Sequence, residues 1–295
     1  MHAMFTPESL TLAPTLTVAP PAVAEPRGPA VRTAGRTLQG SLAELLQLMG
    51  LPQDEAGRHG EMPLAVRRVR TRDTLYHEGS PVEALYFVRG GAFKVFHTDE
   101  EGYQHVVSFV GRSDVLGLDA YGEEHHPSAA TALEESSVFV VLRREIQTLC
   151  QNVPALSRAM HLAAGRALRH GEELTDVMAA VAAEVRLARF LLQLSRRMEA
   201  AGQSPRRFYL RMCRRDLASN LGVAAETISR SFAVLASWGL VNVDDREVEI
   251  LDMEGLRQAA RSTRRQVDDG SHVRLRRPPS LRSLRAAGAL RPNGG

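Results

Sequence analysis

The residues with the clearest chemical potential lie between Cys213 and Phe232, where a polar segment leads into a helical pattern. Glu226, Ser229 and Arg230 are spaced i, i+3 and i+4, so on a helix they project from one face. An arginine can pair two donors with guanine O6 and N7, a glutamate can accept from cytosine N4, and a serine adapts to either partner. These three side chains therefore predict the reading of base edges in double-stranded DNA.

The surrounding sequence predicts a helix-turn-helix that would present these side chains. Gly222 supplies a tight turn, and Arg214, Arg215 and Thr227 are candidates for phosphate contacts. The apolar residues that would face inward are Leu217, Ala218 and Leu221 before the turn, and Ile228, Phe232 and Leu235 after it. Two short strands around residues 244–246 would form a wing. The alternative is an ordinary solvated helix with an i, i+4 pair between Glu226 and Arg230.

Cys213 occupies the position expected for the N-cap of the first helix, with Asp216 three residues later. A helix N-terminus beside Arg214 and Arg215 favours the thiolate form of a cysteine, which makes Cys213 a candidate redox residue. Oxidation would add bulk or negative charge next to DNA phosphates. The simpler alternative is a small residue tolerated at a cap.

Composition limits the classes of protein that the chain can form. It has 295 residues, 37 Lys+Arg against 34 Asp+Glu, and 44% hydrophobic residues, which suggests two domains with room for tails. The two cysteines, Cys150 and Cys213, exclude a disulfide framework and any zinc or iron–sulfur site built from cysteine alone within one chain. No apolar run approaches the ~20 residues of a membrane span, and a secretory signal is not evident. We expect a cytoplasmic protein with no membrane partner.

Residues 64–146 predict an antiparallel barrel or sandwich. Short apolar or alternating runs at 85–88, 92–96, 106–110 and 138–142 are separated by glycine-containing turns. Before them, Leu42, Leu45, Leu46 and Met49 follow Ser41 at helical spacing, which predicts a short helix.

A long helix after Pro154 carries apolar and small residues in alternating steps of three and four. The residues are Leu156, Met160, Ala163, Ala167, His170, Leu174, Val177 and Val181. This spacing is typical of the seam of a two-stranded coiled coil, so we expect a homodimer. An amphipathic helix packed on its own domain is the alternative.

These patterns divide the chain into five segments. We expect a disordered N-terminal tail at 1–40, a β-roll domain at 41–152 and a dimerisation helix at 153–185. A winged helix-turn-helix domain would follow at 186–258, and a basic disordered tail at 259–295.

Over residues 41–258 the sequence resembles the CRP/FNR family of bacterial transcription regulators. The motifs that carry the resemblance are 75–81 (LYHEGSP), 85–91 (LYFVRGG), 117–120 (GLDA) with 125–128 (HHPS), and 226–230 (ETISR). The resemblance implies an α+β chain: an antiparallel β-roll like the cyclic-nucleotide-binding jelly roll, a long dimerisation helix and a winged helix-turn-helix. The Glu-x-x-Ser-Arg pattern after Ala225 is similar to the FNR and FixK branches. That similarity implies a TTGAT-type palindrome and oxygen- or redox-responsive genes. The turn 99–102 resembles the family's loop that touches RNA polymerase.

The sequence departs from the family at both known sensing sites. Where cyclic-nucleotide binders hold the phosphate with a Glu and an Arg-Ser pair, this chain has Leu118 and Pro127-Ser128. Where FNR holds an iron–sulfur cluster, it has no N-terminal cysteines and Phe139 in the roll. We therefore expect neither cofactor and no metal site, and haem or another small ligand in the roll stays open as an alternative.

Four histidines could be imagined as metal or haem ligands: His97, His105, His125 and His126. No second ligand spacing accompanies them. A cupin-like metal enzyme would need converging histidines and carboxylates in the barrel, and it would leave the helix-turn-helix unexplained. We therefore expect a regulator and not an enzyme.

Overall fold

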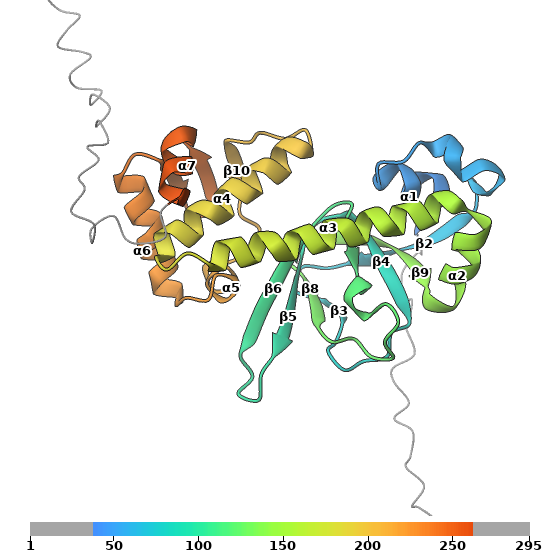
Figure 1. The fold of residues 1–295 in the computed structure, drawn as a ribbon. Helices are drawn as coiled ribbons and strands as arrows, with labels where there is room; N and C mark the ends of the chain where they lie inside the picture. The colour runs from blue at the N-terminus through green and yellow to red at the C-terminus, as the bar shows by residue number, and fades with distance from the viewer. Residues whose placement is uncertain (1–37, 262–295) are drawn as a thin grey trace, which may run out of the picture. The chain divides into compact units, whose positions relative to one another are not determined.

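Two antiparallel sheets form the first part of the described chain. The computed structural model describes residues 38–261 (Figure 1). One sheet has the strand order β1 (Leu38–Ser41), β2 (Pro63–Val69), β9 (Ser136–Leu142), β4 (Ala84–Gly90) and β7 (Val115–Leu116). The other has the order β3 (Thr74–Tyr76), β8 (Ala129–Ala132), β5 (Phe93–Thr98) and β6 (Gln104–Val110). All four apolar runs of the sequence are strands, which confirms the predicted β-roll.

The two sheets bury one shared core, because alternate residues of each strand point to the same face. Val88 and Val138 of the first sheet pack with Phe93, Val95 and Ala130 of the second. Strand β6 pairs only with β5 and lies at the edge of its sheet. The β5–β6 hairpin is prominent in Figure 1.

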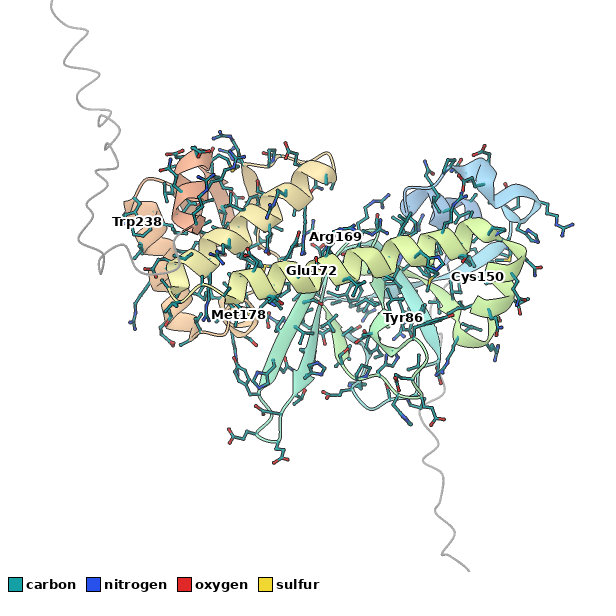
Figure 2. All side chains as sticks on the ribbon, viewed as in Figure 1. Tyr86, Cys150, Arg169, Glu172, Met178 and Trp238 are labelled. Carbon is teal, nitrogen blue, oxygen red and sulfur yellow. The ribbon has the colours of Figure 1, made fainter. Side chains whose placement is uncertain are left out.

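Short helices cover one end of the roll. They are α1 (Leu42–Leu48), the 3-10 helices η1 (Gln53–His59) and η2 (Leu118–Ala120), and α2 (Arg143–Asn152), which carries Cys150 (Figure 2). Ser41 caps α1 as predicted, since its Oγ accepts from the backbone N–H of Glu44 at 3.2 Å. Leu42, Leu45 and Leu46 of α1 are fully buried.

The long helix α3 (Pro154–Met178) begins with proline at its first turn, where a missing N–H costs little. It ends at Met178, and residues 179–182 connect it to α4 (Ala183–Ala200). Val181, predicted to lie in the helical seam, is therefore in the connection, where it is exposed. The buried residues of this connection are Ala180 and Ala182, which pack with Val185 of α4.

The rest of the described chain is a winged helical domain. After α4 come β10 (Arg207–Tyr209), α5 (Arg214–Asn220), α6 (Ala225–Ser237), β11 (Val241–Asp244), β12 (Glu247–Ile250) and α7 (Met253–Arg261). The three strands pair in the order β10-β12-β11, and the apolar faces of α4, α5 and α6 share one core with them. Trp238 marks the end of α6 in Figure 2.

Both predicted tail boundaries are wrong by three residues. Residues 38–40 belong to β1, and residues 259–261 complete α7, where Ala259 and Ala260 are buried. The remainder of the two predicted tails, 1–37 and 262–295, lies outside the described residues. All described residues fall within one contact unit of the chain.

Candidate DNA-binding site

Helices α5 and α6 meet at a turn that requires glycine. Gly222 has φ +63°, a conformation that costs other residues about 1–2 kcal/mol. A Cβ there would lie 2.8 Å from the Cε of Met178, which closes the space beside the turn. Arg186 donates to the carbonyl oxygens of Leu221 (2.9 Å) and Gly222 (3.4 Å). Side chains of α3 and α4 therefore contact the turn of the helix-turn-helix and support it.

The face of α6 that was predicted to read bases is open. Glu226, Ser229 and Arg230 are exposed, Thr227 is half-buried, and Ile228 on the opposite side is fully buried. Within residues 38–261, no ion pair or hydrogen bond joins the side chains of Glu226 and Arg230. The Ser229 hydroxyl makes only a 3.3 Å bond to the carbonyl of Ala225. The i, i+4 pair of the alternative interpretation is thus not formed, and both charged groups remain available.

Cys213 is the N-cap of α5, as the sequence predicted. Its Sγ accepts from the backbone N–H of Asp216 at 3.4 Å, and its thiol donates to Oδ2 of Asp216 at 3.0 Å. The recognition helix α6 has no such cap, since Ala224 offers no side-chain acceptor.

The two arginines after the cap have different environments. Arg215 is exposed, as a phosphate contact requires. Arg214 is half-buried: its guanidinium lies 3.9 Å from the centroid of the Phe232 ring, and Nη2 donates to the carbonyl of Asp245 at 2.6 Å. Arg214 therefore joins α5, the recognition helix and the wing turn.

The wing forms around the predicted residues. Strands β11 and β12 pair antiparallel from Val241 opposite Ile250 to Asp244 opposite Glu247. Asp245 in the turn has φ +47°, a conformation that Asp tolerates better than most residues. The sequence did not reveal β10, a three-residue strand that pairs with β12 and completes the sheet.

The buried part of the roll includes a few polar side chains beside its apolar core. The rings of Tyr76 and His126 stack with centroids 3.9 Å apart, and Ser128 donates to Asp119 at 2.8 Å. Tyr76 Oη and His126 Nδ1 are buried without a hydrogen-bond partner. Burial, with the Asp119 charge, raises the pKa of Tyr76, and burial lowers the pKa of His126. The ring of Tyr86 (labelled in Figure 2) also stacks with that of Tyr76, with centroids 5.9 Å apart.

The other histidines and Cys150 have ordinary roles. His97 lies 3.7 Å from Glu78, and His105 contacts Asp99 at 3.0 Å, both on exposed parts of the β5–β6 hairpin. Residues 38–261 contain no cluster of three or more histidine, cysteine or acidic side chains that could hold a metal. Burial raises the pKa of the Cys150 thiol, which keeps it protonated.

The predicted seam of α3 is divided between two environments. Leu156, Ala163 and Val177 are at most 4% exposed because they pack in the chain's own cores, so they do not form a surface for a partner. Met160, His170 and Leu174 are half-buried, and Ala167 is exposed. Burial and the charge of Arg197 lower the pKa of His170.

A different face of α3 is left open. Leu168 is 71% exposed, and Gly171, Thr175 and Met178 continue its stripe at steps of three and four, with the exposed His161 seven residues before it. Glu172 and Arg169 flank this stripe on α3 (Figure 2). This open stripe of α3 lies on a different face from the predicted seam residues Leu156, Ala163 and Val177, which are buried.

Comparisons with known proteins agree with this architecture. Residues 66–153 match the cyclic nucleotide-binding domain, and residues 185–259 match the Crp-like helix-turn-helix domain. The transcriptional regulatory protein Btr of Bordetella pertussis is 34% identical over 71% of this chain and 87% of its own length. The fumarate and nitrate reduction regulatory protein of Escherichia coli K12 is 33% identical over 66% of this chain and 78% of its own.

Among solved structures, FixK2 from Bradyrhizobium japonicum superposes with a TM-score of 0.60 at 26% identity, covering 68% of this chain and 99% of that one. The fold and the open face of α6 define a helix-turn-helix transcription regulator. The chain belongs to the CRP/FNR family, and its relatives are DNA-binding regulators and not enzymes. None of the described helices has the length and apolar character needed to span a membrane.

Proposed function

We propose that this chain binds, as a homodimer, a palindrome of TTGAT-type half-sites and controls oxygen- or redox-responsive genes in the cytoplasm. The observation that carries this proposal is the exposed set Glu226, Ser229 and Arg230 on one face of α6, in which the two charged side chains do not pair with each other. Arg230 and Glu226 read bases, and Ser229 adapts between them. Arg215 and Thr227 contact phosphates, and Arg214 holds the domain together.

The homodimer forms through the open face of α3. Leu168 is central to it, and the small Gly165 and Gly171 on either side allow two helices to approach closely. Parallel pairing of α3 sets the two recognition helices about one turn of DNA apart, roughly 34 Å. We propose the same functional division that the sequence suggested, with roll, dimerisation helix and winged domain in that order.

The sensing chemistry differs from that of ligand-gated relatives. The rings of Tyr76 and His126 are buried and stacked inside the roll, which supports the expectation that neither a cyclic nucleotide nor haem binds there. We propose Cys213 as the redox-responsive group. It lines a cavity of about 1050 Å³ together with Arg215 and Arg246, so a small oxidant can reach its thiol.

The turn of the β5–β6 hairpin is a candidate contact for RNA polymerase. Residues 99–102 are exposed, and Asp99 accepts from the backbone N–H groups of Glu101 (3.0 Å) and Tyr103 (2.8 Å). These bonds, that from Tyr103 foremost, lower the pKa of Asp99 and keep it ionised. The turn therefore presents a preformed acidic surface.

Selection from a random pool of DNA duplexes tests this function. Purified full-length chain should enrich a palindrome of TTGAT-type half-sites at moderate salt, and its mass in solution should be that of a dimer. A monomeric protein that enriches no palindrome would overturn the proposal.

A further inference from the structure

Helix α5 covers the free edge of the roll. Strand β6 has no second strand neighbour, so its outward backbone groups need other partners. The backbone N–H of Val106 donates to Ser219 Oγ at 2.9 Å, and its carbonyl accepts from Asn220 Nδ2 at 3.1 Å. The Ser219 hydroxyl also donates to the carbonyl of Gln104 at 2.7 Å. Two consecutive side chains of α5 thus take the place of a missing strand.

A buried ion pair lies beside this edge. Lys94 Nζ on β5 is 2.7 Å from Asp216 Oδ1 on α5, and the two side chains are only 13% and 14% exposed. Nζ also donates to Gln104 Oε1 at 2.8 Å. Burial raises the pKa of Asp216, but the hydrogen bonds from Lys94 and Cys213 and the Lys94 charge lower it overall, so the carboxylate stays ionised. Removing one partner of such a pair leaves an uncompensated buried charge.

Two further contacts fix the same interface. Arg211 forms an ion pair with Glu134 of the roll, and the ring of Phe109 on β6 meets that of Phe190 on α4 edge to face, with centroids 6.2 Å apart. Because these contacts lie at several separated points, they determine how the winged domain is oriented on the roll as well as how close to it the domain lies. Glu226, Ser229 and Arg230 remain exposed with all these contacts in place, so the interface does not cover the reading face.

We propose that Lys94 is a positioning residue for DNA recognition. Through Asp216 it holds α5 against β6 and thereby sets the direction in which α6 points from the roll. In a dimer, this direction decides which spacing of half-sites both recognition helices can reach together. This inference rests on the proposed DNA-binding function. It adds Lys94, a residue of the roll that does not contact DNA.

The test measures spacing preference with the full-length chain. The palindrome selected by the wild-type protein is made with the half-sites at the selected spacing, and with one or two base pairs added or removed. Affinities for these duplexes are compared for wild type, Lys94→Gln and Lys94→Glu. We expect Lys94→Gln to lower the preference for the selected spacing by about tenfold, within the usual range of coupling between domains. Lys94→Glu, which places two acids together, should lower it further.

A matched control and a double variant separate this role from general destabilisation. Arg89→Glu makes the same charge reversal on the roll and breaks the more exposed pair with Glu44, away from α5, so it should leave the preference unchanged. In a chain that already carries Asp216→Asn, Lys94→Gln should cause no further loss of spacing preference, because Lys94 acts through the Asp216 carboxylate. If Lys94→Glu fails to fold, the Lys94→Gln series decides.

The outcomes distinguish this proposal from the function on which it rests. If the wild-type chain selects no palindrome, the proposed function fails. If it selects one and Lys94→Gln keeps the full spacing preference, or if Arg89→Glu loses it equally, the positioning role is wrong and the DNA-binding function stands.

Discussion

The guanidinium of Arg214 lies 3.9 Å from the centroid of the Phe232 ring and donates to the backbone carbonyl of Asp245. One side chain at the start of α5 therefore holds the middle of the recognition helix and the wing turn together. Arg214 looked like a phosphate contact in the sequence, where it is indistinguishable from Arg215. Of these two arginines, Arg215 is exposed in the structure and Arg214 is half-buried. A lysine at 214 would keep the charge but lose the planar stacking.

Arg230→Ala should weaken binding to the selected palindrome by about 1–3 kcal/mol and relax the preference at one base position in each half-site. The loss is specific because the bidentate pairing of the guanidinium discriminates between bases. Binding to a panel of single-base variants measures it. Arg257→Ala, which removes an exposed arginine on α7 of the same domain, should leave the panel unchanged. An equal loss on every sequence would contradict base reading by Arg230.

Leu168→Glu should dissociate the dimer. Two leucines would lose burial worth roughly 1.5–3 kcal/mol each, so the dimer dissociation constant should rise at least about a hundredfold. Analytical ultracentrifugation over a concentration series measures it. Leu162→Glu, on an adjacent face and 46% exposed, is the control and should remain dimeric. The proposed seam is wrong if Leu168→Glu dimerises as well as the wild type.

Gly222→Ala should destabilise the chain by more than Gly202→Ala does. Both glycines have positive φ, +63° and +71°, so alanine costs about 1–2 kcal/mol at each. Only at Gly222 does the added methyl meet another group, the Cε of Met178; nothing lies within 4 Å at Gly202. Urea denaturation gives both free energies of unfolding. Equal losses would mean that Met178 moves aside without cost.

Acidification from pH 7 to pH 5 should lower the free energy of unfolding, in part through His126. Burial lowers the pKa of this side chain in the folded chain, with the Asp119 charge opposing the shift. The unfolded chain therefore binds the proton first as pH falls through about 6.5, and stability decreases. His126→Phe keeps the stack on Tyr76 and should flatten this dependence. His170, whose pKa is also lowered, should preserve part of this pH dependence of unfolding in the variant.

The exposed neighbour His125 provides the control for this measurement. His125→Phe should leave the pH dependence of unfolding as it is in the wild type. If His126→Phe has the wild-type slope between pH 5 and 7, the buried histidine does not contribute as its environment implies.

Peroxide should weaken DNA binding of the wild-type chain and leave Cys213→Ser unaffected. An oxidised Cys213 carries oxygen atoms at the N-terminus of α5 and no longer donates its thiol proton to Asp216. Serine keeps a capping oxygen at this position. Cys150→Ser should retain the sensitivity. Sensitivity that persists in Cys213→Ser would remove the redox role.

Local pattern made much of the fold predictable. The strands β4, β5, β6 and β9, the Ser41 cap, the Cys213 cap and the exposed face of α6 all follow from residues within one turn or one hairpin of each other. Long-range contacts could not be read in this way. Lys94 and Asp216 are 122 residues apart, and the only hint was that Lys94 is the sole lysine of the chain. The seam that we propose on α3 differs from the predicted one, because a heptad pattern alone does not tell which apolar stripe of the helix will pack against its own roll.

Ser219 and Asn220 cover the edge of β6 only while α5 stays in contact with the roll. A molecule in which α5 has left the roll would present the bare backbone of Val106 on an unprotected strand, beside a lysine without its counter-ion. Bare strands of this kind adhere to one another between molecules. Detachment of the winged domain would thus threaten solubility as well as DNA recognition, which favours a regulator that adjusts this contact in small steps and keeps it closed.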